Sequence, residues 1–114
     1  MDYHYRLDNG CLHVSLDGRL DTESSIRFDA EITDICRNNP HGSMVIDAGK
    51  LEYIASSGLR TILKLAKSGK EFRIENVSPS VYDVFEMTGF SRIINIRKAL
   101  RKINLEECER IGFG

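Results

Sequence analysis

Apolar and polar side chains alternate in two runs near the start of the chain. The alternation covers residues 3–7 and 11–17, on either side of Asn9-Gly10. Asn-Gly between two alternating runs is a strong short-range signal for a hairpin, because both residues accept the left-handed backbone of a tight turn. We therefore predict a pair of antiparallel strands over these two ranges.

After Gly18 the apolar positions take up a helical period. Four of them share one face of a predicted helix, which ends at the polar segment 38–42. Residues 44–46 follow as a short apolar strand, whose lack of alternation indicates burial on both faces. The four residues of the helical stripe are Phe28, Ile32, Ile35 and Cys36.

The rest of the chain continues to alternate between strands and helices. A polar loop after residue 46 leads to an amphipathic helix that begins at Ser56-Ser57 and ends near residues 68–69. A strand over residues 71–75 comes next. It is followed by a helix that Ser78-Pro79 opens and Gly89 closes. Ile93, Ile94 and Ile96 form the last predicted strand.

Strands that alternate with helices imply parallel pairing through right-handed crossovers. The predicted fold class is therefore α/β, a mixed sheet with an N-terminal antiparallel hairpin and helices packed mainly on one face. The 114 residues suit one domain.

The adjacent serines Ser56 and Ser57 are the first chemical feature of interest. Hydroxyl groups at the start of a helix lie beside unpaired backbone N–H groups and the positive end of the helix dipole, where a phosphate is favourable. The alternative is that one of the two serines serves only as a helix cap, because serine is among the best N-cap residues.

Three sequence elements in order resemble the STAS domain family of bacterial anti-sigma factor antagonists. The family's D-S-S-G-L core is matched by residues 55–59, its G-x-L-D element by residues 18–21, and its T-G element by Thr88-Gly89. The resemblance covers roughly residues 3–100 and implies a STAS-like fold. It also implies that Ser56 accepts a phosphate. The unphosphorylated protein would bind a serine kinase that sequesters a sigma factor, and a serine phosphatase could reverse the modification.

One position departs from the family pattern. Ala55 stands where the family usually has aspartate. That carboxylate could orient the acceptor hydroxyl, cap the helix or help to hold a metal near the kinase's nucleotide. Without it, three outcomes stay open: slower phosphorylation of Ser56, phosphorylation of Ser57 instead, or no phosphorylation.

The resemblance also implies a partner-binding surface around the serines. Asp21 is one member, with an N-cap of the preceding helix as the alternative reading. The exposed rim of the serine helix supplies others, for which an ordinary solvated helix face is the alternative. The predicted partner-binding residues are Asp21, Tyr53, Ser57, Gly58, Arg60, Thr61 and Lys64.

Composition excludes several other classes of protein. The net charge of −1 gives no electrostatic reason to bind nucleic acid or an anionic membrane. Residues 1–4 do not resemble a signal peptide, so we expect a cytoplasmic protein. The three cysteines form no C-x-x-C pair, and the sequence carries no nucleophile elbow or nucleotide-binding glycine motif. We therefore predict no catalytic activity, no metal site and no cofactor.

The end of the chain has its own pattern. Arg97, Lys98, Arg101 and Lys102 read as a solvated helix face. We expect a STAS-like domain over residues 1–103 and a tail over 104–114, which resembles the opening of a kinase-like glycine-rich loop. The alternative functions are therefore a regulatory input module fused to a kinase-like domain, and a STAS domain that senses a nucleotide or another small ligand.

Overall fold

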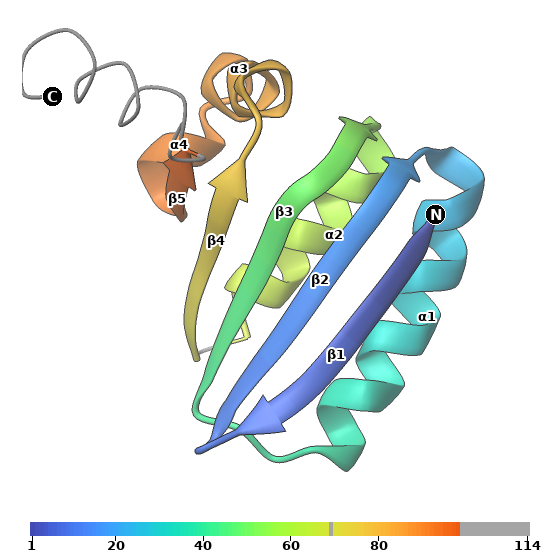
Figure 1. The fold of residues 1–114 in the computed structure, drawn as a ribbon, viewed down its shortest axis with the longest axis vertical. Helices are drawn as coiled ribbons and strands as arrows, with labels where there is room; N and C mark the ends of the chain where they lie inside the picture. Colours follow the sequence, from blue (N-terminus) through green and yellow to red (C-terminus); the bar gives the residue numbers. More distant parts are fainter. Residues whose placement is uncertain (69, 99–114) are drawn as a thin grey trace, which may run out of the picture.

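A computed structural model describes residues 1–68 and 70–98 of the chain (Figure 1). Its five strands form one sheet in the order β1-β2-β3-β4-β5, in which β1 and β2 are antiparallel and the other pairs are parallel. The strands are β1 Asp2–Asp8, β2 Cys11–Leu20, β3 Ser43–Ile54, β4 Glu71–Val77 and β5 Asn95–Lys98. The helices are α1 Thr22–Asn38, α2 Ser56–Ala66, α3 Pro79–Met87 and α4 Phe90–Ile93.

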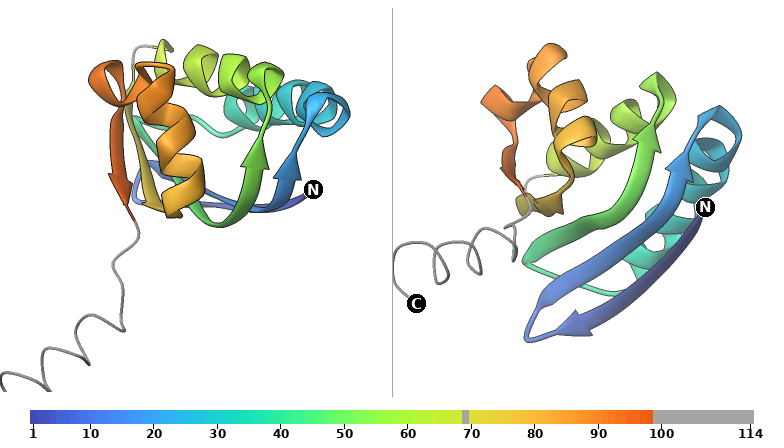
Figure 2. Two further views of the ribbon diagram at one scale, coloured as in Figure 1. Left: turned by 90° about the horizontal axis from the view of Figure 1, so that it is seen from above. Right: turned by 45° about the horizontal axis from the view of Figure 1, so that its top comes forward.

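The helices α1 and α2 lie side by side on one face of the sheet, behind the strands in Figure 1 and above them in the left view of Figure 2. The strand β1 lies at one edge and β5 at the other. The predicted α/β class, with a mixed sheet, an N-terminal hairpin and helices mainly on one face, is therefore confirmed.

The first turn has the geometry that its sequence predicts. Asn9 and Gly10 both have positive φ values, 51° and 78°, as a two-residue hairpin turn of type I′ requires. The strands on either side pair from Asp8 opposite Cys11 to Asp2 opposite Asp17. The antiparallel pair is confirmed and extends by one residue at each end of the first predicted strand.

The core lies between the sheet and the helices. The helical stripe predicted for α1 faces it: Phe28 and Ile32 are buried, and Ile35 and Cys36 pack against the core from its margin. Burial raises the pKa of the Cys36 thiol, because the thiolate would lose its water. This agrees with its predicted role as a small apolar residue.

The strand β3 is much longer than the sequence pattern predicts. We expected a strand over residues 44–46 and then a polar loop, but the strand spans 12 residues in all, from Ser43 to Ile54. Register shifts interrupt its pairing with β2 twice, so that the buried Ala48, Leu51 and Ile54 are spaced by three instead of by two. A spacing of three conceals the strand's alternation, because each bulge adds one residue to one strand only.

The last elements also differ from the prediction. Ile93 lies in the short helix α4 with 65% of its surface exposed, so that the final strand starts two residues later, at Asn95. Arg97 and Lys98 belong to β5 and not to a helix face. Arg101, Lys102 and the tail predicted over residues 104–114 lie outside the described residues.

Candidate functional site

Two helices begin at the same edge of the sheet. The strands β2 and β3 are parallel neighbours that end with Leu20 opposite Ile54. Asp21 follows β2 as the N-cap of α1, and Ala55 follows β3 as the N-cap of α2. The Ala55 amide donates to the Leu20 carbonyl at 2.9 Å. This bond ties the start of α2 to the start of α1. The G-x-L-D and S-S-G-L elements of the sequence therefore meet in space.

Neither serine of the S-S-G-L element caps α2. The N-cap is Ala55, which has no side-chain oxygen and makes no capping hydrogen bond. Ser56 is the first helical residue and is exposed. The Ser57 hydroxyl is buried and has no hydrogen-bond partner within the described residues. The reading of either serine as a simple helix cap is therefore wrong.

Gly58 allows the helix to approach the strands closely. It is buried, and a Cβ atom placed on it would lie 2.9 Å from Leu20 Cδ2 and 2.9 Å from Ile54 Cγ1. These two side chains end the two strands that carry the site. A glycine at this position lets α2 start directly against them, which sets the height of Ser56 above the sheet edge.

Asp21 caps α1 as one reading of the sequence predicted. Its Oδ1 accepts from the Ser24 amide at 2.9 Å, and the Ser24 hydroxyl accepts from the Asp21 amide at 3.0 Å, which forms a capping box. The backbone and side-chain hydrogen bonds from Ser24 hold the pKa of Asp21 below its usual range. The carboxylate is exposed at the same sheet edge as Ser56, so its predicted contact with a partner stays a prediction.

Tyr53 is a second exposed member of the predicted surface. Its side chain is 41% exposed, and the Arg19 guanidinium lies 4.4 Å from the centroid of its ring. Arg19 and Tyr53 are register partners on β2 and β3. The contact is a cation–π pair that holds the ring at the surface. Arg19 was not among the residues predicted from sequence, because nothing in the spacing showed that it lies opposite Tyr53.

Thr61 and Lys64 hold α2 to α1. The Thr61 hydroxyl donates to Asp29 Oδ2 at 2.9 Å, and Lys64 Nζ donates to Asp29 Oδ1 at 2.7 Å. Thr61 is only 3% exposed, so its predicted place on an exposed rim is wrong. Lys64 is exposed but shares its charge with Asp29. Of the three rim residues of this helix, Arg60 is exposed and makes no ion pair within the described residues.

The Asp29 contacts predict a specific acid sensitivity. The hydrogen bond from Lys64, followed by that from Thr61, holds the pKa of Asp29 below its usual range despite some desolvation. A lowered pKa in the folded state stabilises the fold at pH values above the unfolded pKa of about 4, and this contribution is lost as the pH falls through the folded pKa. Since both side chains are partly exposed, the contribution is about 0.5–1 kcal/mol.

Asp29→Asn should therefore lose that stability at pH 7 and none at pH 2. Urea unfolding of the unmodified chain and of Asp29→Asn at pH 7 and pH 2 measures this loss of stability. The difference between the two proteins at each pH isolates Asp29 from the other carboxyl groups. An equal gap between the two proteins at both pH values would contradict the assignment.

A groove of about 290 Å³ runs between α1 and α2 beside the serines. Ile26, 68% exposed, and Arg60 stand at its margin. The buried hydroxyls of Ser25 and Ser57 line it, and neither has a hydrogen-bond partner within the described residues. Sequence reasoning did not find Ser25 or Ile26. The only sequence signal for this groove was that Ile26 lies outside the apolar stripe of α1.

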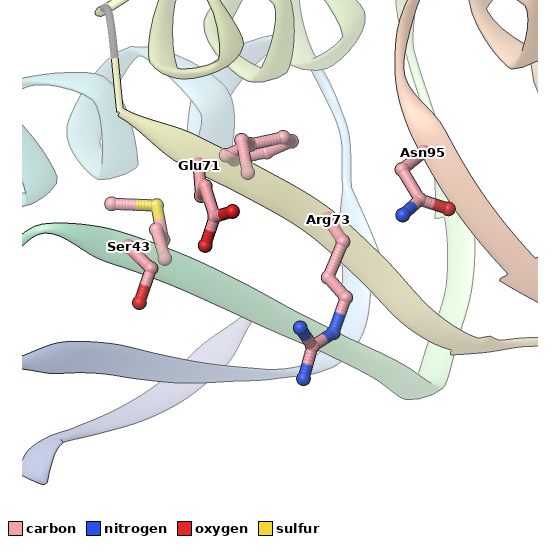
Figure 3. Close-up of a pocket in the computed structure, with 6 residues that line it drawn as sticks. Ser43, Glu71, Arg73 and Asn95 are labelled. Atoms are coloured by element: carbon pink, nitrogen blue, oxygen red, sulfur yellow. The ribbon is translucent and has the colours of Figure 1, made fainter. Parts of the chain in front are cut away.

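Another hollow, of about 140 Å³, opens between the beginnings of β3 and β4 and the strand β5 (Figure 3). Its labelled residues are Ser43, Glu71, Arg73 and Asn95. Because β3 and β4 are parallel, their beginnings lie at the end of the sheet opposite to Ser56. This hollow is therefore separate from the serine site. Residues 1–68 and 70–98 contain no cluster of three or more potential metal ligands.

Comparison with known proteins identifies this arrangement. The family model of the STAS domain matches residues 4–103. The chain belongs to the STAS domain family. A candidate anti-sigma factor antagonist of Bordetella bronchiseptica, BtrV, is 32% identical over 92 residues, which cover 77% of this chain and 78% of BtrV. The chain is thus an anti-sigma factor antagonist-like STAS domain, from a family whose members are typically regulatory and not enzymatic.

Solved structures show the same fold at low sequence identity. A candidate anti-sigma factor antagonist of Thermotoga maritima superposes with a TM-score of 0.76 at 20% identity, covering 92% of each chain. The phosphorylated form of SpoIIAA, a cell fate determinant of Bacillus, superposes with a TM-score of 0.65 at 17% identity, covering 93% of this chain and 98% of SpoIIAA. No helix in the described part of the chain is long and apolar enough to span a membrane.

Proposed function

We propose that this STAS domain binds an anti-sigma factor that is also a serine protein kinase, and that a phosphate on Ser56 ends the complex. One observation carries the proposal: Ser56 is exposed at the first position of α2, at the sheet edge where two helices begin, with Asp21 and Tyr53 exposed at the same edge. The BtrV relative and the phosphorylated SpoIIAA structure support it by family and by fold.

The two serines differ in access, which favours Ser56 as the acceptor. A kinase must bring its nucleotide within bonding distance of the acceptor oxygen. Ser56 presents its side chain to solvent, whereas the Ser57 hydroxyl is buried beneath the first turn of α2. Phosphorylation of Ser57 would first require the start of the helix to open. We therefore infer that Ser56 is modified even though Ala55 replaces the usual aspartate.

The transfer itself needs only positioning by the kinase. Ser56 Oγ forms a bond to the γ-phosphorus of ATP as the bond to the β,γ-bridging oxygen breaks, ADP leaves, and the hydroxyl proton passes to a base of the kinase. The domain supplies the acceptor on a rigid helix start. Ala55 supplies no carboxylate to orient that hydroxyl, so the kinase must supply the orientation.

A phosphate at this position can end binding without unfolding the domain. It adds about −1.5 to −2 charges and three acceptor oxygens at pH 7. The start of α2 tolerates an anion, because its dipole and free N–H groups favour negative charge. The same charge in a closed interface must be stripped of water, which weakens the complex. The energetic effect therefore falls on the complex and not on the fold.

The partner interaction is tested by affinity capture from the protein's own cells, with the unmodified chain and its variants as baits. Ser56→Glu should bind the captured kinase roughly 30-fold more weakly than the unmodified chain, from about 2 kcal/mol for one uncompensated carboxylate in the interface. Ser56→Ala should bind normally. Ser57→Ala should also bind normally, because its hydroxyl is buried and has no partner within the described residues.

Ser80→Glu is the matched control. Ser80 is an exposed serine in the first turn of α3, a helix that follows β4 and carries none of the predicted partner-binding residues. This variant carries the same added charge in the same type of position and should bind like the unmodified chain. Equal binding by Ser56→Glu and Ser80→Glu would contradict the proposed surface.

A further inference from the structure

We propose that Arg60 clamps the phosphate on Ser56 from within the same helix, and that this contact withdraws Arg60 from the partner. The inference rests on the proposed phosphorylation of Ser56. It adds a second consequence of that modification, which concerns a cation that the free domain leaves exposed.

Ser56 and Arg60 are placed to meet. Ser56 is the first residue of α2, and Arg60 follows four residues later. Residues at this spacing lie on one face of a helix with Cβ atoms about 5–6 Å apart. Both side chains are exposed. A phosphoserine and an arginine both extend far enough from the helix to close such a gap through hydrogen bonds.

The Arg60 guanidinium makes no ion pair with the described part of the domain. The three ion pairs within the described residues are Arg37–Asp34, Lys64–Asp29 and Arg73–Glu75. Asp29 lines the same groove as Arg60, but its two oxygens already accept from Lys64 and Thr61. No ion pair joins Asp29 to Arg60 within the described residues.

The surroundings of Ser56 on its own helix hold no acidic group that would repel a phosphate. The first turn of α2 contains no acidic residue, and its N-cap is the neutral Ala55. In chains of the family's usual pattern, an aspartate at this position would lie next to the phosphate and oppose the clamp. Arginine matches the geometry of a phosphate with paired N–H donors. The neutral Ala55 and the cationic Arg60 therefore both favour a contact between the phosphate and Arg60.

The clamp gives phosphorylation two effects on the partner. The phosphate introduces charge into the interface, and it also occupies the guanidinium that the unmodified domain can offer to a partner's acidic group. Since Arg60 stands at the margin of the groove between α1 and α2, its turn toward Ser56 changes the groove's margin as well. The release does not require any movement of the backbone.

The test uses the full chain with phosphoserine incorporated at position 56 during translation, so that it does not depend on a cellular kinase. The pKa of the second phosphate proton is read by phosphorus NMR. Arg60→Gln should raise this pKa by roughly 0.2–0.4 units, because an ion pair at this spacing favours the dianion. Lys67→Gln, which removes one exposed positive charge from the opposite end of the same helix, should leave it unchanged.

A third variant, Ala55→Asp, tests the effect of a negative charge beside the phosphate. It should raise the pKa of the second phosphate proton, because the added carboxylate disfavours the dianion. An unchanged pKa in Arg60→Gln, or an equal shift in Lys67→Gln, overturns the clamp. Either result leaves the phosphorylation of Ser56 in cells untouched, because that is a separate measurement. Conversely, a clamp found on the incorporated phosphoserine does not by itself show that cells phosphorylate Ser56.

Discussion

Gly58→Val will destabilise the domain by about 2–3 kcal/mol, because the new side chain has no space. A Cβ atom alone would lie 2.9 Å from both Leu20 and Ile54, and valine adds two methyl groups beyond it. The glycine's poor helix propensity returns only part of this loss. Denaturant unfolding measures the change, and the start of α2 should shift away from the sheet.

Gly42→Val is the control for this prediction. Gly42 is exposed, its backbone is not left-handed, and a Cβ atom placed on it would have no neighbouring atom within 4 Å. Its substitution should change the free energy of unfolding by less than about 1 kcal/mol. If both glycine variants lose the same stability, the close approach of α2 to Leu20 and Ile54 is not what Gly58 provides.

Phe28→Ala will cost about 4 kcal/mol, the largest effect that we expect from one substitution. Phe28 is 1% exposed in the core under α1, and Tyr3 of β1 packs edge-on against its ring with centroids 5.2 Å apart. The truncation leaves a cavity and removes the aromatic contact that holds the edge strand to the helix. Chemical denaturation measures the loss.

Ile26→Ala is the matched control on the same helix. Ile26 is 68% exposed, so its truncation should change stability by less than about 0.5 kcal/mol. A small loss for Phe28→Ala, comparable to that of Ile26→Ala, would mean that α1 packs differently from the arrangement described. Weaker partner capture by Ile26→Ala at unchanged stability would extend the binding surface along the groove.

The hairpin and the helices could be predicted from sequence because their signals are local. Asn9-Gly10 specifies its own turn, and the stripe from Phe28 to Cys36 specifies its own face. The strand β3 could not be predicted in full. Its bulges depend on pairing with β2, which is a relation between distant segments, and they break the alternation on which a sequence reading relies.

The sequence predicted which residues gather at the candidate site but not how they are arranged there. Its resemblance to the STAS family placed Ser56, Asp21 and Arg60 in one region. Yet it did not show that Ala55 would be the N-cap and that the Ser57 hydroxyl would be buried. Thr61 looked exposed because a threonine beside charged residues resembles a solvated face. It is buried because Asp29, on another helix, supplies its hydrogen-bond partner.

The proposed function requires a regulatory phosphate on Ser56. The most direct test is phosphosite mapping by mass spectrometry on the protein isolated from its own cells under several growth and stress conditions, with Ser56→Ala as the control. We predict phosphate on Ser56, absent from the control, and none on Ser57, whose hydroxyl is buried. No phosphate on Ser56 under any condition, or phosphate found on Ser57 instead, would contradict the proposed switch.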